Sequence, residues 1–160
     1  KENGAVLLLY KTARTDMDIL DEAVGAANWT NDYKEIKGNL YCGLAVREKE
    51  DAPFIWKWDC GIESREDGDG NEKKGEASDA FKRAGFRWGI GRELYTAPFI
   101  WISAEDADIK QGGNGKFQCY DKFIVEQIIY DENRTIVALS IKNTKTGKRV
   151  FLMDNRKKAS

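Results

Sequence analysis

The amino-acid sequence predicts an α+β fold in which an antiparallel three-stranded meander is covered by one long helix and followed by a β-rich C-terminal extension. Two observations support this prediction. Three successive segments have the apolar patterns and flanking turn residues of strands: 29–37, 40–47 and 54–61. The helix expected next, over 74–89, carries its apolar residues on one narrow side: Ala77, Phe81, Ala84 and Trp88. A stripe of that width is suited to packing on a sheet.

The elements before the meander are a strand and a helix. Residues 5–12 are apolar and predict a buried strand, and residues 15–24 predict a helix. Asp16 and Asp18 enrich the first turn of this helix, and Gly25 is expected to end it.

The meander is expected to have one packed face and one partly solvated face. Lys37-Gly38-Asn39 predicts a tight turn between its first two strands. The second strand directs alternate apolar residues inward: Leu40, Cys42, Leu44 and Val46. In the third strand Phe54, Trp56, Trp58 and Cys60 share one face, and the other face carries Ile55, Lys57 and Asp59.

The rest of the chain predicts a second β-rich part. Residues 99–102 are a candidate strand, 110–115 a glycine-rich loop, and 154–160 a basic tail. Three further strands are expected: 116–130, 134–142 and 148–153. We therefore divide the chain into a core over 1–102, in the order β-α-β-β-β-α, and a hairpin-rich extension over 103–160 packed on the same domain.

Composition excludes several classes of site. The 160 residues contain no histidine, which removes histidine-based catalytic triads and histidine metal sites. The three cysteines, Cys42, Cys60 and Cys119, fit no zinc spacing and are expected to be free thiols in a reducing cytoplasm. The chain has no run of 18 apolar residues, so no transmembrane helix is expected.

Charge is segregated along the chain, although the net charge is only −1. Residues 73–92 carry six basic and two acidic side chains, and residues 62–72 carry one basic and five acidic. Residues 142–158 carry seven basic and one acidic. A polyanion responds to local charge within about 8–10 Å. The two basic segments, 73–92 and 142–158, can therefore bind nucleic acid although the net charge of the chain is close to zero.

The long helix presents Lys82 and Arg83 opposite its apolar stripe, with Phe86 one turn further on. A solvated surface is the ordinary interpretation of such a pair. A large aromatic beside two cations instead favours a protein–protein contact or a nucleic-acid surface, where stacking and phosphate contacts act together.

This helix and its surroundings resemble the Rad-fifty-two-like single-strand annealing proteins, in particular short phage and prophage recombination proteins of the Sak type. The similarity covers roughly residues 5–102. In and after the long helix it rests on Gly75, Ser78-Asp79-Ala80, Lys82-Arg83-Ala84, Trp88-Gly89-Ile90-Gly91-Arg92 and Leu94-Tyr95. Before the helix it rests on Thr12-Ala13-Arg14, Leu20-Asp21-Glu22, Gly25, Asn28-Trp29, Tyr33-Lys34-Glu35, Trp56-Lys57-Trp58-Asp59 and Gly61.

The resemblance implies a protein without enzymatic activity, catalytic residues, metal or cofactor. It would bind single-stranded DNA and anneal complementary strands without ATP, in phage homologous recombination and DNA repair in the cytoplasm of a bacterial host. Its implied partners are single-stranded DNA, further copies of itself in a ring or filament, and a single-strand binding protein, with no membrane. The implied DNA contacts are Arg14, Lys74, Lys82, Arg83 and Arg87. Phe86 is expected to be a subunit or stacking contact because of its place beside Lys82 and Arg83, although some members of the family carry arginine there.

Two other functions remain open from the sequence. One is a module that binds double-stranded DNA or RNA without annealing it. The other is a carboxylate-metal nuclease that uses Glu63, Asp67 and Asp69. The pattern Asp67-x-Asp69-x-Asn71 begins like a calcium-binding loop, but Glu72 and Ser78 stand where glycine and glutamate are needed. The acidic segment is therefore interpreted as a solvated loop.

Overall fold

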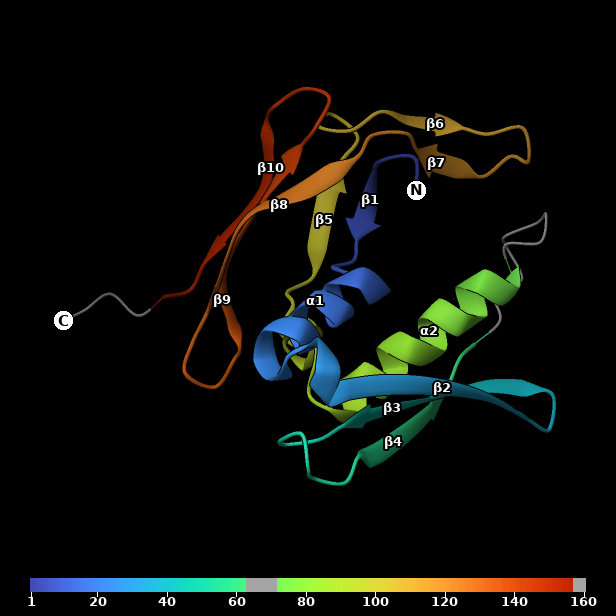
Figure 1. Ribbon diagram of the computed structural model, residues 1–160. Coiled ribbons are helices and arrows are strands. Elements are labelled where there is room, and N and C mark those ends of the chain that lie inside the picture. The colour runs from blue at the N-terminus through green and yellow to red at the C-terminus, as the bar shows by residue number, and fades with distance from the viewer. Residues whose placement is uncertain (63–71, 157–160) are drawn as a thin grey trace. The chain divides into compact units, whose positions relative to one another are not determined.

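The computed structural model describes residues 1–62 and 72–156. Within these ranges the chain is mixed α+β, with two α-helices and ten strands that all pair antiparallel. It divides into two compact units (Figure 1), which we call the meander unit, Tyr10–Arg92, and the β-rich unit, formed by Lys1–Leu9 together with Glu93–Ser160.

The meander unit consists of three strands covered on one face by a long helix, as the sequence predicts (Figure 1). The strand order is β2-β3-β4, with β3 in the middle. In chain order the elements are α1 (Ala13–Val24), the short 3-10 helix η1 (Ala26–Asn28), β2 (Trp29–Ile36), β3 (Asn39–Val46), β4 (Ile55–Cys60) and α2 (Glu72–Arg87).

Local sequence signals set the ends of these elements. The Thr12 hydroxyl accepts a hydrogen bond from the Thr15 backbone N–H and so caps α1. Gly25, at φ 83°, ends α1, and its N–H donates to the carbonyl of Asp21. Lys37 and Gly38 both have positive φ, which is the backbone of a two-residue hairpin turn between β2 and β3.

The core of the meander unit lies between the sheet and α2. Cys42 and Leu44 of β3 and Phe81 of α2 are fully buried there. Ala80 and Ala84 let the helix approach the sheet closely, and Leu20 of α1 closes the same cluster. The inward packing expected for Cys42, Leu44 and Val46 and for Phe81, Ala84 and Trp88 is therefore confirmed.

The strand register determines which face of β4 meets the helix. Leu44 is paired with Lys57 and Cys42 with Asp59, so these two charged residues lie on the face covered by α2. Gly43 is paired with Trp58 and Ala45 with Trp56, which places both indoles on the opposite face of the sheet.

The long helix ends two residues earlier than expected, at Arg87 rather than 89. Trp88 begins a turn in which Gly89 has φ 98° and Gly91 has φ 78°. A Cβ atom on Gly91 would lie 2.1 Å from Cε of Lys11, so this position combines a left-handed backbone with a close approach.

The β-rich unit is built from three small sheets. β1 (Gly4–Leu7) pairs with β5 (Ile100–Ser103), and β6 (Ile109–Gln111) pairs with β7 (Phe117–Cys119). The largest sheet has the order β10-β9-β8, from β8 (Phe123–Tyr130), β9 (Ile136–Asn143) and β10 (Arg149–Asp154). A second 3-10 helix, η2 (Arg92–Thr96), begins at the last residue of the meander unit.

The structure divides the chain differently from the expected boundary after residue 102. β1 belongs to the β-rich unit because it pairs with β5, a strand of that unit that lies far along the chain. The strand expected over 116–130 is also two strands, β7 and β8, because Asp121 between them accepts a hydrogen bond from the Asp108 N–H.

No helix in the described part of the chain combines the length and apolar character needed to cross a membrane.

Candidate nucleic-acid interface

The outward side of α2 carries two of the expected contact residues, Lys74 and Lys82. Lys74 is exposed in the first turns of the helix. Lys82 retains 34% of its side-chain exposure, and its Nζ lies 3.8 Å from a carboxylate oxygen of Asp79, one turn earlier. A pair this long and this exposed is weak, so Lys82 can exchange Asp79 for a phosphate at little cost.

Arg83 and Arg87 point to the side of α2 that lies beside β4, where they share one carboxylate. Nε of Arg87 donates to Oδ2 of Asp59 at 2.9 Å, and Nε of Arg83 lies 3.5 Å from Oδ1. The Asp59 side chain is 16% exposed, whereas Arg83 and Arg87 are about half exposed. One carboxylate that faces two guanidinium groups leaves this edge with a net positive charge.

Asp59 is held in its charged form. Its partial burial would by itself raise the pKa, but the hydrogen bonds from the Cys60 backbone N–H and from Arg87, with the charges of Arg83 and Arg87, outweigh burial and lower the pKa below its ordinary value. Asp59 therefore remains ionised throughout the neutral range and orients both arginines.

Two further cations lie at the C-terminal end of α2. Lys57 donates to the carbonyl of Arg87 at 3.2 Å, and Arg92 donates to the carbonyls of Phe86 and Arg87. These carbonyls belong to the last helical turn, where positive charge is favoured, and the Phe86 carbonyl also accepts from the Gly89 N–H. The Arg92 guanidinium also lies over the Phe86 ring, 5.4 Å from its centroid. Phe86 therefore has a partner within its own chain.

Arg14 is exposed in the first turn of α1, after the Thr12 cap. This end of α1 packs against the C-terminal part of α2. Asp16 is buried and accepts a hydrogen bond from Nζ of Lys11 at 2.6 Å, and a Cβ on Gly85 would lie 2.8 Å from the same carboxylate. The absence of a side chain at Gly85 thus brings the turn that carries Arg14 to α2.

The acidic candidates of the sequence cannot be placed. Glu63, Asp67, Asp69 and Asn71 lie outside the described residues. Among the residues that are described, no group of three or more Cys, Asp or Glu side chains is arranged to hold a metal ion. All three cysteines are unpaired, and Cys42 is fully buried.

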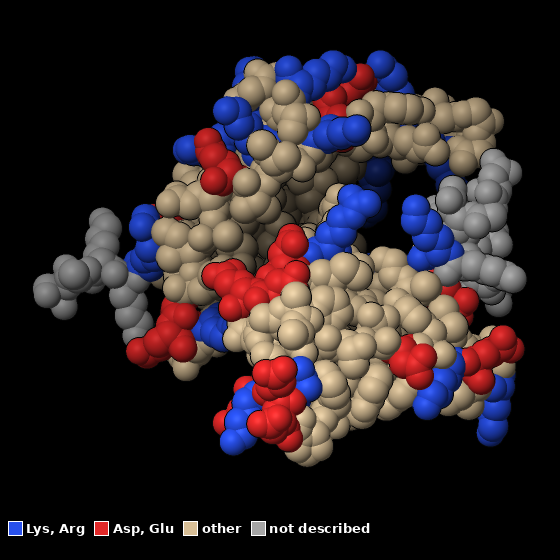
Figure 2. Space-filling view, viewed as in Figure 1, with Lys and Arg blue, Asp and Glu red and all other residues tan. Residues whose placement is uncertain are grey.

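Sequence reasoning did not assign Lys57 and Arg92 to this surface. Both follow signals that were visible: Lys57 alternates with two tryptophans along β4, and Arg92 comes directly after the glycines that end the helix. Their positions depend on the carbonyls of the last turn of α2, and the exact end of a helix is poorly determined by sequence. Figure 2 shows basic and acidic side chains next to one another at several places on the visible face.

Comparison of the chain with protein-family models, with curated proteins and with solved structures found no match to any of them.

Proposed function

We propose that this protein binds single-stranded DNA along α2 and anneals complementary strands without ATP or metal, as a Rad-fifty-two-like annealing protein of the short phage type. The observation that carries the proposal is the separation of the faces of α2. Its apolar side is buried on the meander, and its remaining surface holds Lys74, Lys82, Arg83 and Arg87. Of these four residues, Lys82 and Arg83 belong to the motifs on which the family resemblance rests.

The side chains of the α2 surface are suited to binding the sugar-phosphate backbone of DNA. Lysine and arginine contact phosphates, position a strand and carry no base information themselves. Bases left free can then pair with a second strand held in the same way, and base pairing supplies the free energy. This mechanism requires no group that activates water or hydrolyses a nucleotide.

Self-assembly forms part of the proposal. One protomer offers only a short run of cations, and a long polyanion is bound tightly when such runs repeat in register. β2 and β4 are the two edges of the described meander sheet, and unpaired strand edges can be extended by a neighbouring copy. A ring or filament would align the α2 surfaces of successive protomers.

The test is oligonucleotide binding by the double variant Lys82→Ala, Arg83→Ala. We expect most single-strand affinity to be lost, and the salt dependence to flatten by about 0.7 in log–log slope for each phosphate contact removed. The matched control is Lys49→Ala with Lys116→Ala, which removes two exposed cations that have no charged partner among the described residues. Equal affinity and slope for the folded double variant and the control would contradict the assignment.

The same titration separates the second function left open by the sequence. Binding of double-stranded DNA or RNA at least as tight as that of single strands, with no faster annealing, would identify a binding module instead.

A further inference from the structure

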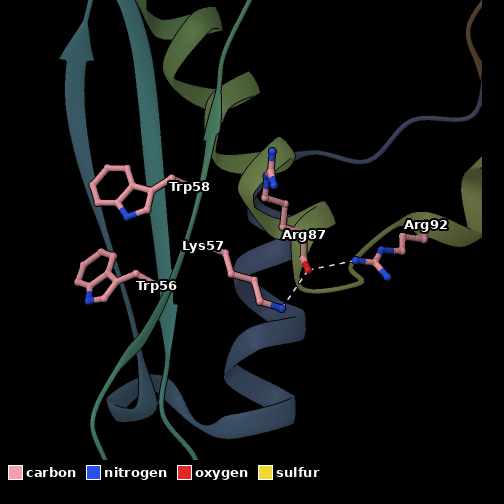
Figure 3. Close-up of a pocket in the computed structure, with 5 residues that line it drawn as sticks. All are labelled: Trp56, Lys57, Trp58, Arg87 and Arg92. Atoms are coloured by element: carbon pink, nitrogen blue, oxygen red, sulfur yellow. Dashed lines mark hydrogen bonds between the residues drawn. The ribbon is translucent and has the colours of Figure 1, made fainter.

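The face of the meander that is turned away from α2 carries two parallel indole rings. Trp56 and Trp58 project from β4 with ring centroids 5.7 Å apart and planes inclined by 20°. Trp56 remains 41% exposed, and its indole N–H has no hydrogen-bond partner among the described residues. In Figure 3 both rings lie on one side of β4, opposite to Lys57. Two adjacent indoles on one face form a contiguous apolar surface, and such a surface rimmed by polar groups can mark an interaction site.

The sheet holds this pair rigidly. Trp58 lies directly over Gly43 of β3, where an added Cβ would meet its ring atoms at 2.6 Å. On β2, the Nζ of Lys34 lies 4.5 Å from the centroid of the Trp58 ring. Trp58 is thus fixed between a glycine and a cation, and Trp56 is positioned against it. Stacking on Trp58 thus lowers the cost of ordering the Trp56 ring when a planar group stacks on it.

The indoles share a surface hollow with cations. The hollow, of about 510 Å³, runs along the open edge of β4 and is lined by Trp56, Lys57, Trp58, Arg87 and Arg92 (Figure 3). Three of these five residues are positively charged and none is acidic. Lys57 and Arg92 are held by the carbonyls at the end of α2, and Arg87 by Asp59. Aromatic surface and fixed positive charge line one site.

This combination matches the chemistry of a nucleotide within a single strand. A base can stack on an indole regardless of its sequence, and the adjoining phosphates complement the three cations. An apolar partner would leave the cations unmatched, and a simple anion would not use the rings.

We propose that the β4 edge is a second subsite for single-stranded nucleic acid, in which one base stacks on Trp56 and the flanking phosphates contact Arg87 and Arg92. This inference rests on the proposed function and extends it: the α2 surface holds the backbone, and the β4 edge holds one base. Arg87 belongs to both surfaces and joins them. A stacked base gives the strand a fixed point while the other bases remain available for pairing.

The test compares binding of a thymidine oligonucleotide by wild type, Trp56→Ala and Trp56→Phe. Losing one base–aromatic stack should weaken binding about tenfold in Trp56→Ala, while Trp56→Phe retains most of the affinity. The salt slope should be unchanged, because Trp56 contacts a base and no phosphate. The control is Ile36→Ala, which removes an exposed apolar side chain from the opposite edge of the same sheet.

A second readout uses tryptophan emission. The oligonucleotide should quench the emission of wild type, and Trp56→Phe, which keeps an aromatic ring but removes the indole fluorophore, should lose most of that quenching. Unchanged affinity and unchanged quenching would overturn the subsite while leaving the proposed function standing. A change in sedimentation without a change in binding would make this face a contact between copies, which also overturns it. Absence of binding by wild type would contradict both proposals.

Discussion

The substitution Asp59→Asn removes the carboxylate that holds Arg83 and Arg87 and leaves both arginines able to bind DNA phosphates. Among the described residues, Asp59 is the one carboxylate in contact with both Arg83 and Arg87. Asparagine keeps the size of the side chain and one acceptor oxygen but removes the charge. The variant should therefore be less stable than wild type and bind single-stranded DNA more tightly.

Both magnitudes follow from the geometry. The two arginines are about half exposed, so solvent screens their pairs with Asp59, and we expect a loss of about 1 kcal/mol in the free energy of unfolding. Removing one negative charge next to bound phosphates is worth about 1 kcal/mol at contact distance in water, which is about fivefold in affinity.

The stability difference should depend on pH in a defined direction. Because the pKa of Asp59 is lowered in the folded protein, its ion pairs stabilise the fold above the pKa of the unfolded chain. That contribution is lost as pH falls through the folded-state pKa, so wild type and Asp59→Asn should converge in acid.

Urea unfolding and oligonucleotide titration measure the two effects. The control is Asp18→Asn, which changes net charge equally at an exposed position of α1 that forms no ion pair with an arginine of the described ranges. Tighter binding by both variants would mean that only total charge matters. Weaker binding by Asp59→Asn would show that DNA needs the arginines as Asp59 orients them, and would refute the reasoning.

Three further outcomes are expected. Trp88→Ala should lower the free energy of unfolding, measured in urea, by about 3 kcal/mol. The reason is that the partly buried indole packs on the core, donates a hydrogen bond to the Leu44 carbonyl and lies under the Lys57 ammonium. A loss of DNA binding with unchanged unfolding would instead make Trp88 a stacking residue. Phe86→Glu should weaken DNA binding or assembly, measured by titration and sedimentation, with unchanged melting, whereas Phe86→Leu should not. Burial raises the pKa of Cys42 to about 11. In the native protein at about pH 8 this thiol should therefore resist a colorimetric thiol reagent, and the same reagent should label it in urea. Fast labelling of Cys42 in the native protein would contradict its burial.

Much of the meander unit follows from its sequence. Alternation in β3 and the helical spacing of Phe81 and Ala84 each depend on local periodicity, and the structure buries these residues as expected. The hairpin turn at Lys37 and Gly38 and the end of α1 at Gly25 are likewise local, since each depends on one or two backbone conformations.

The pairings between strands that are distant in the sequence could not be predicted from local sequence patterns. β1 joins β5, and nothing in the short apolar sequence of β1 specifies that partner. The face of β4 was ambiguous too. Trp56 and Trp58 are the more apolar set, yet Lys57 and Asp59 lie beneath α2 because they satisfy the helix carbonyls and its arginines. Polar partners on another element decided the orientation, and the periodicity of a single strand contains no information about them.

Within the candidate site, the outward direction of Lys82 was predictable from helix geometry, whereas the sharing of Asp59 by Arg83 and Arg87 was not. That contact joins residues on a strand and a helix separated in sequence by the acidic segment. It changes the expectation for the surface, because two of its cations are partly neutralised before any DNA arrives.

The central proposal is tested most directly by annealing itself. Two complementary oligonucleotides with a donor and an acceptor fluorophore are mixed with the protein, without nucleotide and in the presence of a metal chelator. Wild type and the Lys49→Ala, Lys116→Ala control should accelerate pairing, and Lys82→Ala, Arg83→Ala should not. Pairing at the spontaneous rate with wild type, under conditions in which it binds each single strand, would contradict it.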